Sequence, residues 1–152
     1  MAKKKQINGL MTGLAGEYMV AGMMNMKGWI ASLTLKNFPG VDIFGKNPET
    51  DQNISVQVKT TRDKYSFNIG INRPKRKELD QIIKGPFVFV HIDESENVSY
   101  YILTRDEIID LINTTDDEYF SKKKDKSKED YPMAIQHNYL TPFKDKWESL
   151  WK

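Results

Sequence analysis

The pattern that most constrains this chain is the strict alternation of apolar and polar residues in 54–59, Ile-Ser-Val-Gln-Val-Lys. Successive side chains of a β-strand point to opposite faces of the sheet, so Val56 and Val58 share one face. Gln57 and Lys59 share the other face. The pattern therefore predicts a strand that buries one face in a core and places an amide and a lysine together on the opposite face.

A second short strand is predicted at residues 41–44, followed by a polar loop rich in turn-forming residues. If the two strands form a hairpin, the numbers of paired residues sum to about 98 or 99, which places Asp42 opposite Val56 or Gln57. The apolar neighbours of Asp42 must share the core with Val56. This requirement selects Gln57 as the partner of Asp42.

A carboxylate, an amide and a lysine then converge on one patch, and this is the set of groups that phosphodiester hydrolysis needs. Asp42 and Gln57 each supply an oxygen, the ligand type that Mg²⁺ prefers. A bound metal ion can polarise a phosphate and lower the pKa of its water. Lys59 can stabilise the attacking hydroxide or the charge that develops on phosphorus.

A carboxylate in the first predicted helix, residues 10–26, adds to this set. The helix is apolar or small on nearly all sides, which is typical of a buried helix. Glu17 follows Leu10 by seven residues and Leu14 by three, so it lies on their side of the helix. A buried carboxylate is costly unless it is paired, protonated or close to a metal or water. A metal site where the helix meets the sheet would explain Glu17.

The remaining elements complete an α/β pattern without repeats or a second-domain linker. Further strands are predicted at 29–35, 65–71, 87–92 and 98–103, with 87–92 as a central strand. Helices are predicted up to Lys84, from a Thr104 cap through Ile112, and over the tail at 141–152. A mobile charged loop is predicted at about 114–132. The order is helix, three strands, then further strands and helices.

Composition limits the class of protein. The 152 residues suit a single domain, 1–152, and the net charge of +2 neither requires nor excludes a polyanionic partner. The sequence has no cysteine, which excludes disulfides and thiolate chemistry and suits a cytoplasmic location. No apolar run is long enough to predict a membrane span.

These residues resemble the PD-(D/E)XK nuclease superfamily, whose members share the restriction-endonuclease-like fold. The resemblance rests on Glu17 in a first helix, Val41-Asp42-Ile43 on one strand and Gln57-Val58-Lys59 on the next. It implies an αβββαβ core with a mixed sheet flanked by helices, matching residues 10 to about 103, with C-terminal helices added. Gly40 and Val41 stand where the family name suggests proline. Gln57 stands in place of the usual acid, so the motif is a D…QxK variant of unassigned specificity.

The resemblance also implies roles for the residues of the site. Asp42 and Gln57 would be metal ligands, and the Val58 carbonyl would supply a further oxygen. Glu17 would act as the helix acid, linked to the metal through water, and Lys59 would be the catalytic lysine. The implied metal is Mg²⁺ or Mn²⁺. Replacing an acid by Gln57 removes a negative charge from the site and is expected to weaken metal binding.

Basic residues after the third strand suggest where a nucleic acid could bind. They could form a phosphate-binding edge, but a solvated charged loop and helix start explains them equally well. The residues are Arg62, Arg73, Lys75, Arg76 and Lys77.

Three functional hypotheses follow. The first is a metal-dependent nuclease, an endonuclease acting on DNA. The second is a non-catalytic domain of the same fold that binds nucleic acid or a protein partner. The third is an unrelated α/β binding protein whose polar strand face is merely solvated. The sequence leaves open whether the chain forms a homodimer, and fold alone does not decide function.

Overall fold

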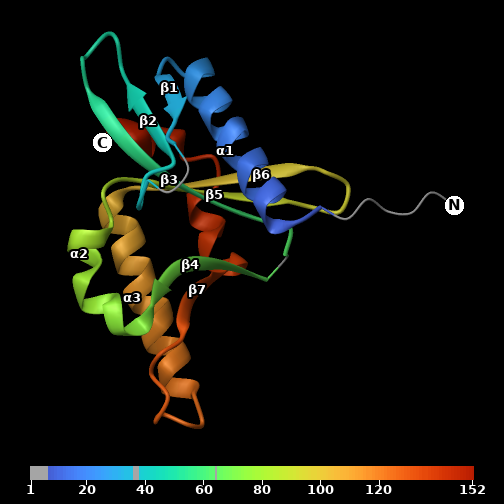
Figure 1. Cartoon of the computed structure of the whole chain (residues 1–152), viewed down its shortest axis with the longest axis vertical. Coiled ribbons are helices and arrows are strands. Elements are labelled where there is room, and N and C mark those ends of the chain that lie inside the picture. The colour runs from blue at the N-terminus through green and yellow to red at the C-terminus, as the bar shows by residue number, and fades with distance from the viewer. Residues whose placement is uncertain (1–6, 36–37, 64) are drawn as a thin grey trace, which may run out of the picture.

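The computed structural model describes residues 7–35, 38–63 and 65–152 (Figure 1). Its elements follow the predicted order, with additions near the C-terminus. They are α1 (Gly9–Met26), β1 (Ile30–Leu33), β2 (Ile43–Lys46), β3 (Asn53–Thr61), β4 (Ser66–Asn72), the 3₁₀ helix η1 (Arg73–Glu78), α2 (Leu79–Ile82), β5 (Phe87–Ile92), β6 (Val98–Leu103), α3 (Arg105–Lys122), β7 (Pro132–Gln136), and the 3₁₀ helices η2 (His137–Phe143) and η3 (Trp147–Trp151).

The central sheet has five strands in the order β1-β2-β3-β5-β6. β1, β2 and β3 are antiparallel neighbours, β3 and β5 are parallel, and β5 and β6 are antiparallel, so the sheet is mixed. The first four residues of β5 are all buried, as predicted for a central strand. A parallel pair needs a crossover, and the segment from β4 through α2 provides it.

Each face of the central sheet carries its own apolar core. On one face, α1 packs Val20 and Met24 against Val56 and Val58 of β3. On the other face, a layer of β4, β7, α2 and α3 covers the half of the sheet formed by β5 and β6. Figure 1 shows α1 and the β1–β2 hairpin together in the upper part of the molecule, with α3, β4 and β7 below.

Two predicted boundaries are wrong because tertiary contacts override the local pattern. α3 runs to Lys122, ten residues beyond Ile112, so the first part of the predicted loop at 114–132 is helical. The run that suggested a loop is polar, but Thr115 and Asp116 are buried on the inner side of the helix. The capping box of Thr104 and Glu107 at the start of α3 is confirmed.

The strand predicted at 65–71 is present as β4, but the sequence did not indicate its pairing partner. It pairs with β7, a strand that the sequence pattern did not indicate, in a two-stranded sheet separate from the central one. Its inward residues Phe67 and Ile69 are 2% exposed and pack over the aromatic face of β5. This second sheet brings β4 over the polar face of β3.

The tail folds as two 3₁₀ helices, so the single helix predicted over residues 141–152 is wrong. Pro142 lies inside η2, and Asp145 has a φ of 56°, which no α-helix accommodates. Trp147 is buried and docks the tail on the sheet, while Trp151 packs against Trp29 with ring centroids 4.8 Å apart.

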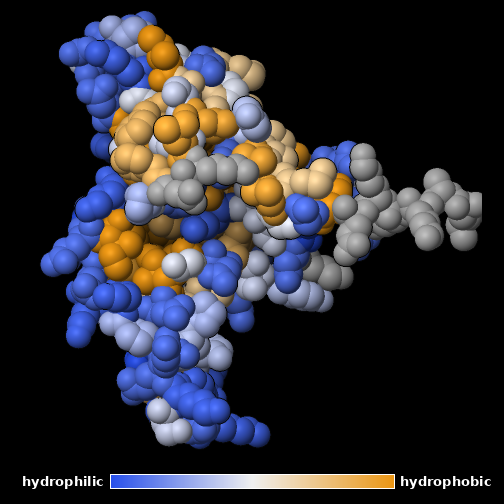
Figure 2. All heavy atoms as spheres, in the orientation of Figure 1, coloured by the Kyte–Doolittle hydropathy of each residue, from blue (hydrophilic) through white to orange (hydrophobic). Residues whose placement is uncertain are grey.

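The exposed apolar surface is uneven. Figure 2 shows part of it over α1 and the β1–β2 hairpin and another part beside α2 and the start of α3, whereas the far end of α3 is hydrophilic. Within the described residues, no helix combines the length and hydropathy that crossing a membrane requires.

Candidate functional site

The hairpin of β2 and β3 has the register that the alternation predicts. Ile43 pairs with Val56, and the Asp42 N–H donates to the Val56 carbonyl at 2.9 Å. Asp42 therefore lies opposite Gln57, one residue before β2 begins. Ile43 and Val56 are fully buried on the α1 side, which leaves Asp42 and Gln57 together on the opposite face.

The Asp42 carboxylate is held by two donors from β3. The Gln57 side chain donates from Nε2 to Oδ2 at 2.6 Å, and the Val58 backbone N–H donates to the same oxygen at 2.7 Å. Both hydrogen bonds are accepted by the same oxygen, Oδ2 of Asp42. This contact fixes the side chain of Asp42 beside the one strand that carries both Gln57 and Lys59.

The segment before β2 is anchored to β1 by Thr34. Its N–H donates to the Asp42 carbonyl at 2.9 Å, and its hydroxyl donates to the Val41 carbonyl at 2.7 Å. Asp42 is therefore fixed through its backbone on one side and through its carboxylate on the other. Such support from neighbouring groups is what a preorganised site requires.

Lys59 lies two residues beyond Gln57 on the same face of β3, close enough for its charge to act on Asp42. Burial lowers the pKa of Lys59, and the Asp42 charge partly opposes that shift. Burial likewise raises the pKa of Asp42, opposed by the Val58 N–H, the Lys59 charge and the Gln57 amide. Two partly desolvated groups of opposite charge therefore share this patch, an arrangement typical of functional sites.

Glu17 lies in α1 and is half-buried. It directly follows Gly16, where α1 comes very close to β3. At Gly16, an added Cβ would stand 1.7 Å from the Thr60 hydroxyl oxygen, so only glycine permits this approach. Thr60 therefore faces α1, whereas its neighbour Lys59 is on the opposite face of β3. The role of Glu17 as the helix acid stays a prediction.

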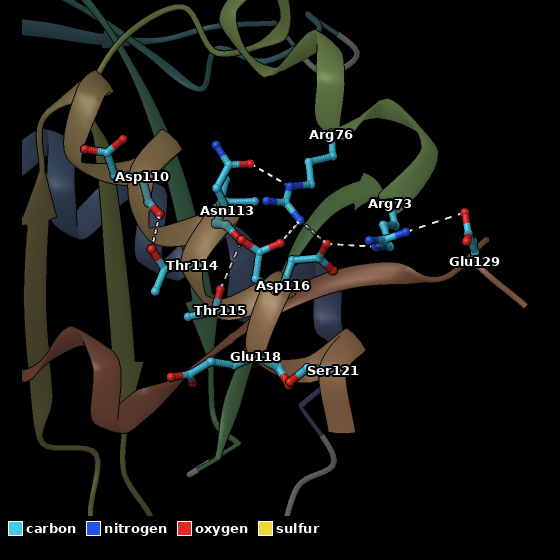
Figure 3. A network of polar contacts seen from close by, with 12 residues as sticks. Arg73, Arg76, Asp110, Asn113, Thr114, Thr115, Asp116, Glu118, Ser121 and Glu129 are labelled. Atoms are coloured by element: carbon cyan, nitrogen blue, oxygen red, sulfur yellow. Dashed lines mark hydrogen bonds and ion pairs between the residues drawn. The ribbon is translucent and has the colours of Figure 1, made fainter. Parts of the chain in front are cut away.

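The five basic residues predicted to form a phosphate-binding edge lie in two different environments, two of them partly buried and three exposed. Arg73 and Arg76 of η1 are bound to Asp116 of α3, at 2.9 Å each (Figure 3). The Tyr131 hydroxyl donates to the other Asp116 oxygen at 2.8 Å. Asp116 is buried, with its side chain 2% exposed, whereas the two arginine side chains are 19% and 23% exposed. These two arginines connect η1 to α3 instead of extending into solvent.

The other three predicted phosphate contacts are exposed. Lys75 forms an ion pair with Glu78 at 3.3 Å, and Arg62 donates to the Thr12 hydroxyl at 3.3 Å. Lys77 borders a cleft of about 650 Å³ between η1 and α3, together with Asn113 of α3. The structure does not bring these residues together with Asp42 and Lys59 in one set of contacts, and their role in nucleic-acid binding stays a prediction.

The donor set at Asp42 suits a hard divalent cation in part. Asp42 supplies a carboxylate oxygen, and rotation of the Gln57 amide would present its oxygen on the same side. Among residues 7–35, 38–63 and 65–152, no group of three or more His, Cys, Asp or Glu side chains is placed to hold a metal ion. A metal ion here would therefore keep several water ligands, as Mg²⁺ commonly does.

Sequence reasoning missed two features of this region. Gly70 of β4 lies against the Lys59 amine, and the Val58 N–H, not only its carbonyl, contributes to the site. No local signal in the sequence indicated either contact, because each depends on how the strands are assembled.

Comparisons with known proteins support the fold. The sequence matches no protein-family model and no curated protein. Among solved structures, the chain is similar to a bacterial homing endonuclease, I-Ssp6803I, with a TM-score of 0.55, 13% identity, and coverage of 94% of this chain and 91% of that one. It is also similar to Hjc, a Holliday junction resolvase of Archaeoglobus fulgidus, with a TM-score of 0.48, 10% identity, and coverage of 87% and 88%. The likeness to the homing endonuclease confirms the predicted fold class, a mixed sheet flanked by helices.

Proposed function

We propose that this chain is a metal-dependent nuclease that hydrolyses phosphodiester bonds in DNA. The observation that carries the proposal is the convergence of Asp42, Gln57 and Lys59 on one polar patch of a hairpin. The similar fold of a homing endonuclease supports the choice of reaction. Phosphodiester hydrolysis also suits the chemistry of these side chains, which combine oxygen ligands with a positive charge.

Asp42 and the Gln57 amide oxygen would hold Mg²⁺ or Mn²⁺, with the Val58 carbonyl as a further ligand and Glu17 linked through water. When bound, the metal ion would supply Lewis acidity toward the phosphate and a more acidic water. The contact from the Val58 N–H orients Asp42 before any ligand arrives.

Lys59 would act on the reacting phosphate. Its amine lies in a partly desolvated position, where an electrostatic interaction is stronger than in bulk water. A fixed positive charge beside the phosphate stabilises the negative charge that develops in the transition state, and it costs no reorganisation at that moment. The charge of Asp42 in turn favours the protonated form of Lys59.

A second candidate is a non-catalytic domain that binds nucleic acid or a protein partner. One observation favours it: Gln57 stands where an acid is usual, and its Nε2 donates to Asp42. The pair therefore carries a single negative charge, so a divalent cation would be bound more weakly than by two carboxylates.

The test is a cleavage assay on duplex, single-stranded and branched DNA and on RNA, with Mg²⁺, Mn²⁺ or a chelator. We expect metal-dependent DNA cleavage that falls by roughly a hundredfold or more in Asp42→Ala and in Lys59→Ala. Lys124→Ala is the matched control, because it removes an exposed cation that lies outside the predicted phosphate-binding edge. Its cleavage rate should stay near that of the wild type.

Two outcomes would contradict the proposal. Binding of DNA without cleavage under every metal condition would favour the non-catalytic domain. Cleavage that survives in both Asp42→Ala and Lys59→Ala would place the catalytic site elsewhere in the chain.

A further inference from the structure

β4 has an irregular backbone beside Lys59. It pairs regularly with β7 from Ser66 to Asn68, but between Asn68 and Asn72 it advances four residues while β7 advances two. The extra residues form a bulge, which bends the strand and redirects it. Bulges of this kind are frequent next to active sites, where they aim side chains.

Gly70 lies in this bulge with a φ of 75°, a conformation that side-chain-bearing residues rarely adopt. The Asn68 side chain accepts a hydrogen bond from the Gly70 N–H at 2.7 Å, so the bulge is held by its own sequence. Ile69, between these two residues, is buried and anchors the strand to the core beneath. The backbone at Gly70 is therefore fixed in place.

The bulge also meets the Lys59 amine. A Cβ built on Gly70 would lie 3.2 Å from Lys59 Nζ, which is tighter than ordinary van der Waals contact. The amine is thus enclosed on one side by the backbone of β4 and acted on by the Asp42 charge. Any side chain at this position would compete with the amine for space.

We propose that Gly70 is a positioning residue, whose missing side chain and left-handed backbone let the Lys59 amine rest against β4 and be directed toward Asp42. The inference rests on the proposed function in that Lys59 acts on the substrate. It adds that the second sheet, and not only the β2–β3 hairpin, builds the site.

The first test is Gly70→Ala in the cleavage assay. Displacing a reacting group by about 1 Å can cost a hundredfold, so we expect kcat to fall roughly ten- to a hundredfold with little change in KM. In a Lys59→Ala background, Gly70→Ala should cause no further loss, because it acts through the amine. An equal loss in both backgrounds would overturn the proposal.

Gly28→Ala is the matched control. Gly28 also has a positive φ, of 96°, but an added Cβ there meets only Trp151 at 3.9 Å. It therefore introduces similar backbone strain without touching Lys59, and its kcat should stay near the wild-type value. If Gly70→Ala fails to fold, Asn68→Ala removes the hydrogen bond that holds the bulge without adding a methyl group, and it should lower kcat by a smaller factor.

A second readout does not depend on cleavage. In NMR spectra of protein labelled at lysine ¹³Cε, the Lys59 signal is assigned by its loss in Lys59→Ala. We expect this signal to shift at constant pH in Gly70→Ala and to stay in place in Gly28→Ala. An unchanged Lys59 signal in Gly70→Ala would overturn the positioning role, even if the wild-type protein cleaves no DNA.

Discussion

Asp116 offers a sharp test of how the second layer is held together. Its buried carboxylate accepts from Arg73 Nε and Arg76 Nη1 at 2.9 Å and from the Tyr131 hydroxyl at 2.8 Å. Asp116→Ala would leave two guanidinium groups and a hydroxyl without this shared acceptor. Breaking a buried ion pair by removing one partner costs about 3–5 kcal/mol.

The lower end of that range applies here. Both arginines retain partial contact with water, and Arg76 keeps its bonds to Asn113 and Asp117. We expect Asp116→Ala to lose about 3 kcal/mol of unfolding free energy, which corresponds to a drop of roughly 6–12 °C in Tm for a domain of this size.

Urea and thermal unfolding followed by far-UV circular dichroism measure this loss. Asp117→Ala is the control, because Asp117 also pairs with Arg76, at 2.6 Å, but its side chain is 67% exposed. Exposed ion pairs contribute little, so its transition should match the wild type. A loss below about 1 kcal/mol in Asp116→Ala would refute the structural role of the network. Tighter DNA binding by a fully stable Asp116→Ala would instead make the arginines phosphate contacts.

Three further changes test the packing and the chemistry of the site. Gly16→Ala should destabilise the protein by about 1–3 kcal/mol, because its Cβ would overlap Thr60. Gly22→Ala is the control, because an added Cβ there meets open space and should stabilise α1 by up to about 1 kcal/mol. Equal effects of the two substitutions in denaturant unfolding would contradict the close approach of α1 to β3. The raised pKa of Asp42 means that the folded state holds this proton more tightly than the unfolded state. The unfolding free energy of the wild type should therefore fall as pH rises from 3.8 through the raised pKa of Asp42, and Asp42→Asn should not show this fall. The same dependence of unfolding free energy on pH in both proteins would contradict the raised pKa of Asp42. Gln57→Glu should strengthen Mg²⁺ binding in calorimetric titration by adding an anionic ligand, and unchanged affinity would argue against Gln57 as a ligand.

The hairpin at the site could be predicted because its signals are local. Alternation assigns the faces of β3, and the polar turn sets the register that places Asp42 opposite Gln57. The capping box that begins α3 is likewise a contact between residues three apart. Glu17 was identified as an acid in an apolar helix, and Gly16 beside it shows how closely α1 approaches β3.

The basic segment shows where local reasoning stops. The sequence pattern was equally consistent with a solvated charged loop at Arg73 and Arg76. Their partner, Asp116, lies some forty residues later, in a segment that the sequence predicted to be a loop. Only the packing of η1 on α3 turns exposed-looking charges into a partly buried network. The end of α3 likewise could not be predicted locally, because Asp116 on its inner face is buried in that network.

The sequence by itself determined the elements whose periodicity and turns are encoded within a few residues: α1, the β2–β3 hairpin with its Asp42–Gln57 pair, and the buried strand β5. The tertiary structure alone decided that β4 lies outside the central sheet, pairs with β7 and brings Gly70 against Lys59. The physical reason is that a strand pattern specifies which face is buried but not which partner satisfies its backbone hydrogen bonds. That choice depends on the packing of Phe67 and Ile69 over the aromatic face of β5.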